Sequence, residues 1–188
     1  MAERKIVVDT NFFILLQKVD PDCSLVSLLS DCLCGELVGE FPQLALMDQC
    51  EEVIGMVGCQ DVTDEESALF VNCWSGRADL RRLQRDPADL KLIIYAQRHA
   101  GALLLTSDRP MLLVAEELNI ERRCFKAALG DMNESLEGAI SDDTTYATEM
   151  MYDPGGNHPF FCYGVDTHCP SCDPARHCGH RQDLQQKS

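Results

Sequence analysis

The sequence lacks any segment that could cross a membrane. No stretch approaches the roughly 18 uninterrupted apolar residues that a transmembrane helix needs. The charged start at Glu3, Arg4 and Lys5 is not followed by the apolar core of a signal peptide. Internal repeats are also absent. We therefore expect a soluble, intracellular protein of the cytoplasm with no membrane partner.

Positive charge is scarce. The chain has 16 lysines and arginines against 31 aspartates and glutamates, a formal net charge of −15, which excludes a protein that coats nucleic acid non-specifically. Between Arg77 and Lys126, however, ten basic residues outnumber seven acidic ones. Arg77, Arg81 and Arg85 recur at helical spacing on one face. We expect this face to guide nucleic-acid phosphates, or else to be a solvated surface paired with nearby acids.

The 188 residues, 45% of them hydrophobic, suffice for one main domain with a core. Eleven cysteines are present, and most are scattered through apolar segments, where a free cysteine behaves as a small hydrophobe. This scatter indicates a reducing compartment. The scattered set is Cys23, Cys32, Cys34, Cys50, Cys59, Cys73 and Cys124.

Strands and helices alternate along the first 125 residues. Strands are expected at 5–8, 44–47, 102–106 and 122–125. Helices are expected at 11–18, at 24–33 with Gly35 as its stop, from Asp48 to Gly58, at 63–76, from Asp86-Pro87 to Gly101, and at 110–118. This alternation predicts an α/β fold with a largely parallel sheet.

Carboxylates follow two of the expected strands. Asp9 ends the first strand and Asp108 follows "LLLTS". Because right-handed crossovers bring the carboxyl ends of parallel strands to one edge, these side chains are expected to meet. Asp89 lies in the first turn of the helix before the Asp108 strand, and Glu52, with Glu51 as its rival, lies in the helix near the second strand. Converging carboxylates favour Mg²⁺ or Mn²⁺; singly, each could serve a turn, a helix terminus or a solvated surface.

Three stretches, "VVDTNFF", "CEEVIG" and "DPADLKLIIYAQRHAGALLLTSD", resemble the motifs of the PIN domain family of metal-dependent nucleases. The resemblance covers residues 4–126. It implies a three-layer α/β/α domain over residues 1–130 whose acidic metal site, catalytic as well, consists of Asp9, Glu52, Asp89 and Asp108. It also implies hydrogen-bonding support from Asn11 and Thr106, with Ser107 beside them.

The end of the chain has a different composition. Residues 131–157 are polar and acidic and are expected to form a linker. In 158–188, four cysteines with the spacing C-x6-C-x2-C-x5-C are interleaved with histidines, a pattern that predicts Zn²⁺ binding. The candidate ligands are Cys162, Cys169, Cys172, Cys178, His168, His177 and His180. The alternative is a flexible tail with incidental cysteines.

The sequence therefore predicts a Mg²⁺- or Mn²⁺-dependent endoribonuclease that cleaves single-stranded RNA. The toxin of a toxin–antitoxin pair is one version of this activity. The alternative from another class is a non-catalytic PIN-like scaffold that binds a protein partner through its acidic surface or the zinc-binding tail. A homodimer is a further possible assembly.

Overall fold

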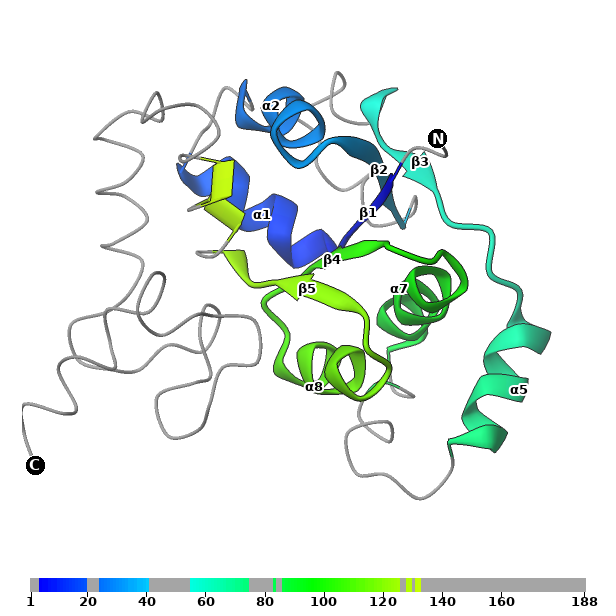
Figure 1. Cartoon of the computed structure of the whole chain (residues 1–188). Coiled ribbons are helices and arrows are strands. Elements are labelled where there is room, and N and C mark those ends of the chain that lie inside the picture. Colours follow the sequence, from blue (N-terminus) through cyan, green and yellow to red (C-terminus); the bar gives the residue numbers. More distant parts are fainter. Residues whose placement is uncertain are drawn as a thin grey trace, which may run out of the picture.

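The computed structural model describes residues 4–19, 24–40, 55–74, 83, 86–125, 128–129 and 131–132. Five strands and five helices are resolved in this part of the chain (Figure 1). The strands are β1 (Arg4–Val8), β2 (Gly35–Gly39), β3 (Gly58–Cys59), β4 (Leu103–Leu105) and β5 (Glu121–Arg123). The helices are α1 (Thr10–Val19), α2 (Ser24–Leu33), α5 (Asp64–Cys73), α7 (Pro87–Arg98) and α8 (Arg109–Glu117).

The five strands form one sheet in the order β3-β2-β1-β4-β5, and every pairing is parallel. The predicted α/β fold with a parallel sheet is thus confirmed. Strand β1 lies at the centre, where the chain first builds outward through β2 to β3 and later through β4 to β5. A reversal of this kind leaves a crevice at the carboxyl ends of the two central strands.

Two hydrophobic clusters cover opposite faces of the sheet, because successive strand residues point to opposite sides. Ile6 and Val8 of β1 belong to one cluster, with residues of α1 and α2. Val7 belongs to the other, with residues of α5, α7 and α8. In Figure 1, α1 and α2 accordingly lie on one side of the sheet and α7 and α8 on the other. The first cluster continues to Met132, which is fully buried.

Strand β2 was not predicted, and it corrects the interpretation of Gly35. Helix α2 ends at Leu33, Cys34 takes the left-handed conformation with φ of 54°, and Gly35 then begins β2. A side chain at Gly35 would place its Cβ only 2.5 Å from the carbonyl oxygen of Arg4 on the neighbouring strand. The glycine therefore serves close strand pairing and does not stop the helix.

Two other expectations at element ends were wrong. Gly58, expected to close a helix, is the first residue of β3. Strand β5 ends at Arg123, and Phe125, expected in that strand, is helical and packs edge-on against Phe12 with ring centroids 5.1 Å apart. The strand expected at 44–47 and the start of the helix expected from Asp48 lie outside the described residues.

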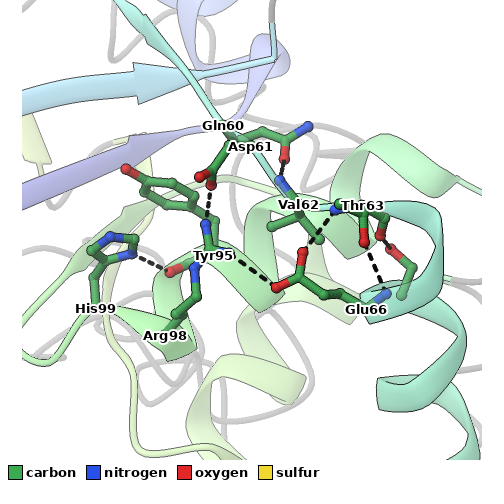
Figure 2. Close-up of polar contacts among 9 residues, drawn as sticks. Gln60, Asp61, Val62, Thr63, Glu66, Tyr95, Arg98 and His99 are labelled. Atoms are coloured by element: carbon green, nitrogen blue, oxygen red, sulfur yellow. Dashed lines mark hydrogen bonds and ion pairs between the residues drawn. The ribbon is translucent and has the colours of Figure 1, made fainter.

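Helix α5 is attached to α7 by polar contacts (Figure 2). Thr63 and Glu66 form a reciprocal capping box at its start. Arg98, the last residue of α7, pairs with both Asp61 and Glu66 and lies 5.4 Å from the centre of the Tyr95 ring. These contacts lie at the carboxyl-terminal end of α7, whereas Asp89 lies in its first turn.

None of the described helices combines the length and the apolar character needed to cross a membrane.

Candidate functional site

The candidate site lies at the carboxyl ends of β1 and β4, where the order of the strands reverses. Asp9 follows β1, and Thr106, Ser107 and Asp108 follow β4. The backbone N–H of Asp9 donates to the carbonyl oxygen of Leu105 at 2.9 Å, so the two strand ends are held side by side. Ligands of open parallel sheets bind at such a position.

Asp9 is a buried carboxylate, only 1% exposed. One oxygen, Oδ1, accepts a hydrogen bond from the backbone N–H of Asn11 at 3.1 Å, and Oδ2 accepts one from the hydroxyl of Thr106 at 2.7 Å. Burial raises the pKa of Asp9 to about 6, the two hydrogen bonds oppose that rise, and the charges of Asp108 and Asp86 add to it. Asp9 is therefore held in place but is costly to ionise.

Thr106 joins the two strand-end aspartates. Its O–H donates to Asp9, and its oxygen accepts from the backbone N–H of Asp108 at 3.0 Å. Asp108 in turn caps α8, because its Oδ1 accepts from the backbone N–H of Met111 at 3.0 Å. Ser107 is also buried, and its hydroxyl accepts from the backbone N–H of Phe125 at 3.3 Å. Ser107 thus holds the start of the segment that follows β5, whereas Thr106 acts on Asp9 directly.

Asp89 reaches the same region from the first turn of α7, behind the N-cap Asp86. Burial raises the pKa of Asp89 to about 8, and the charges of Asp9, Asp86, Asp108 and Glu40 raise it further. Asp89 therefore lies within electrostatic range of both strand-end aspartates. Of the described acids, it is the one whose ionisation these neighbours oppose most.

Glu40, which sequence analysis did not single out, directly follows β2. Its Oε2 is buried and has no hydrogen-bond partner. Burial raises the pKa of Glu40, Lys91 opposes that rise, and Asp86 adds to it. The signal lies in "GELVGE", where the apolar Leu37 and Val38 lead to a glutamate as "KIVV" leads to Asp9. The expectation of a helix stop at Gly35 conceals this strand.

The charges of these carboxylates influence one another's pKa values, but the carboxylates do not form a complete set of metal ligands. Within the described ranges, no three histidine, cysteine, aspartate or glutamate side chains are gathered so that they could hold a metal ion. Oxygen donors of this kind suit hard divalent cations, and Mg²⁺ usually keeps several waters and binds through one or two carboxylates. Asn11 contributes its backbone N–H, and its side chain is exposed.

Several predicted site residues lie outside the described residues. They are Glu51 and Glu52, the arginines Arg77, Arg81 and Arg85, and the zinc candidates Cys162, His168, Cys169, Cys172, His177, Cys178 and His180. The predicted Asp9, Asp89 and Asp108 lie within the described part, as do Thr106 and Ser107.

Comparison of the chain with protein-family models, with curated proteins and with solved structures finds no match.

Proposed function

We propose that this chain is a Mg²⁺- or Mn²⁺-dependent endoribonuclease that hydrolyses phosphodiester bonds of single-stranded RNA, built on a three-layer PIN-like domain. One observation carries the proposal. Asp9, Asp89 and Asp108 come from three separate elements, yet each of the other two carboxylates raises the pKa of Asp89 at the switch point of the sheet. Mutual repulsion of this kind is a cost that a bound cation would remove.

The donor chemistry fits such a cation. The groups at this edge are carboxylates, the preferred ligands of Mg²⁺ and Mn²⁺, and one buried carboxylate oxygen, Glu40 Oε2, has no partner in the described part of the chain. Asp9, Asp89 and Asp108, with Glu52 from the sequence motif, would hold the ion. When bound, it would stabilise charge on the scissile phosphate and lower the pKa of a water molecule.

The chain's own residues would position these groups. Thr106 fixes Oδ2 of Asp9, and the N–H of Asn11 fixes Oδ1, so the carboxylate cannot rotate freely. Capping of α8 fixes one oxygen of Asp108. Such support is what a precise site requires from surrounding hydrogen bonds.

In a chain of net charge −15, RNA needs a local basic face, and we propose Arg77, Arg81 and Arg85 for that role. We further propose a nuclease domain at 1–130, an acidic linker at 131–157 and a zinc-binding tail at 158–188. Thiolate and imidazole suit Zn²⁺, whereas the carboxylate site suits harder ions, so the two metals would be sorted by ligand type.

Cleavage of a single-stranded RNA by the full chain with Mn²⁺ tests the proposed activity. Asp9→Asn and Asp108→Asn should each lower the cleavage rate by about two orders of magnitude or more, because each removes a charged oxygen donor. Thermal stability should stay unchanged or rise, because one like charge is removed from a repulsive group. Asparagine remains a good N-cap, so Asp108→Asn should keep α8 intact.

Glu65→Gln is the matched control, since Glu65 is an exposed carboxylate in the first turn of α5. It should cleave at the wild-type rate. Wild-type protein that cleaves no single-stranded RNA with either Mn²⁺ or Mg²⁺ would contradict the proposed function and favour the non-catalytic scaffold.

A further inference from the structure

The pairing of β1 with β2 places Glu40 level with Asp9. The register runs from Arg4 opposite Gly35 to Val7 opposite Val38. Gly39 is still in strand geometry, because its carbonyl oxygen accepts from the N–H of Gln60 at 3.1 Å. Two more steps in the same register bring Glu40 opposite Asp9.

The pairing on the other side of β1 extends the same row. Val8 lies opposite Leu105, so the next pair along is Asp9 and Thr106. Glu40, Asp9 and Thr106 therefore occupy one level across three neighbouring strand ends. The hydrogen bond of 2.7 Å between Thr106 and Asp9 shows that the row persists past the last ladder pair.

Alternation along the strands then decides which face these side chains take. Val7, Val38 and Leu104 all belong to the cluster packed against α7 and α8. Two residues further along each strand, Asp9, Glu40 and Thr106 point to that same face. This is the face covered by α7, the helix that carries Asp89.

The carboxylate of Glu40 has one oxygen without a hydrogen-bond partner among the described residues. Its Oε2 is buried without a hydrogen-bond partner among the described residues, and burying a carboxylate oxygen without compensation is unfavourable. Lys91 lowers the pKa of Glu40, but its Nζ is bound to Oδ1 of Asp64 at 2.9 Å. Within the described residues, Oε2 of Glu40 therefore lacks a hydrogen-bond donor.

We infer that Glu40 supplies a carboxylate from β2 to the divalent cation of the proposed site, in the row that it forms with Asp9 and Thr106. This inference rests on the proposed function and adds a ligand that the sequence motif did not contain. The resemblance to the PIN motifs gave Glu52, twelve residues later in the chain, as the metal ligand near the second strand.

Binding of Mn²⁺ to the full chain, measured without RNA by isothermal titration and by the Mn²⁺-induced rise in melting temperature, tests this inference. The tail is kept loaded with zinc during the titration, so that its thiolates do not take up Mn²⁺. Glu40→Gln keeps the size of the side chain and should raise the dissociation constant for Mn²⁺ about tenfold or more. It should also diminish the rise in melting temperature.

Glu36→Gln is the matched control. Glu36 is a glutamate of the same strand, but it lies four residues earlier and pairs with Lys5 at the opposite end. Its Mn²⁺ affinity should match that of wild type.

Wild-type affinity in Glu40→Gln would overturn the inference while leaving the proposed function intact. A wild-type chain that binds no Mn²⁺ would overturn both. A wild type that binds Mn²⁺ through Glu40 but cleaves no RNA would support the inference and contradict only the nuclease activity.

Discussion

At the scale of single residues, one hydroxyl group organises the centre of the site. Thr106 donates to the buried carboxylate of Asp9 and accepts from the N–H of Asp108. Thr106→Val keeps the shape of the side chain but removes both hydrogen bonds. We expect the free energy of unfolding in urea at pH 7 to fall by about 1–3 kcal/mol, because a buried carboxylate oxygen and a backbone N–H lose their partners.

The pKa of Asp9 should rise further in the same variant, since the Thr106 hydrogen bond opposes the effect of burial. Thr106→Ser keeps the hydroxyl and should lose much less stability. Equal losses in the valine and serine variants would show that the methyl group contributes as much as the hydroxyl, and would contradict the role given to the two hydrogen bonds.

At the scale of elements, α5 is held mainly by its first turn. Its buried apolar contribution is Phe70, whose ring stacks on Trp74 at 5.8 Å, while Leu69 is 65% exposed. Thr63→Ala removes the acceptor for the N–H of Glu66. We expect the variant to lower the free energy of unfolding by about 1 kcal/mol and to speed hydrogen exchange in α5 while α7 stays protected.

Thr63→Ser should behave like wild type, because serine caps a helix as well as threonine does. Faster exchange spread equally over α5 and α7 would contradict the interpretation that α5 is a separately held element.

At the scale of the whole molecule, the acids make stability depend on pH. Folding raises the pKa of Asp9 from 3.8 to about 6 and that of Asp89 from 3.8 to about 8. The folded state therefore binds protons more tightly than the unfolded state. The stability that these two groups contribute is complete below pH 3.8 and is lost as the pH rises through about 6 and then about 8.

Asp89→Asn should remove the larger share of the loss of stability that the wild type undergoes as the pH rises. In urea denaturation without Mg²⁺ or Mn²⁺, its free energy of unfolding should exceed that of wild type at pH 8 by on the order of 1 kcal/mol. The gain should be smaller at pH 5, where wild-type Asp89 is already protonated. Asp31→Asn, on an exposed residue of α2, serves as the control. A gain independent of pH would contradict the electrostatic explanation.

The sequence by itself determined the α/β class and most helix positions. It also determined that Asp9 and Asp108 follow strands and that Asp89 lies in the first turn of a helix. These features depend on local signals: apolar runs such as "KIVV", the Asp86-Pro87 helix start, and acids next to strand ends. Helix α2 (Ser24–Leu33) has the predicted bounds, and α7 begins at the predicted proline.

Only the tertiary structure decided what depends on contacts between distant segments. In the sequence, Gly35 has the features of a helix stop, and only its close approach to β1 shows that it begins a strand. A two-residue strand such as β3 is too short to show any hydrophobic periodicity. Strand register determines that Glu40 lies level with Asp9. The raised pKa of Asp89 follows from burial and from four charges, three of which (Asp9, Asp108 and Glu40) lie on other segments. Pairing and burial are properties of the packed chain, so no single stretch of sequence contains them.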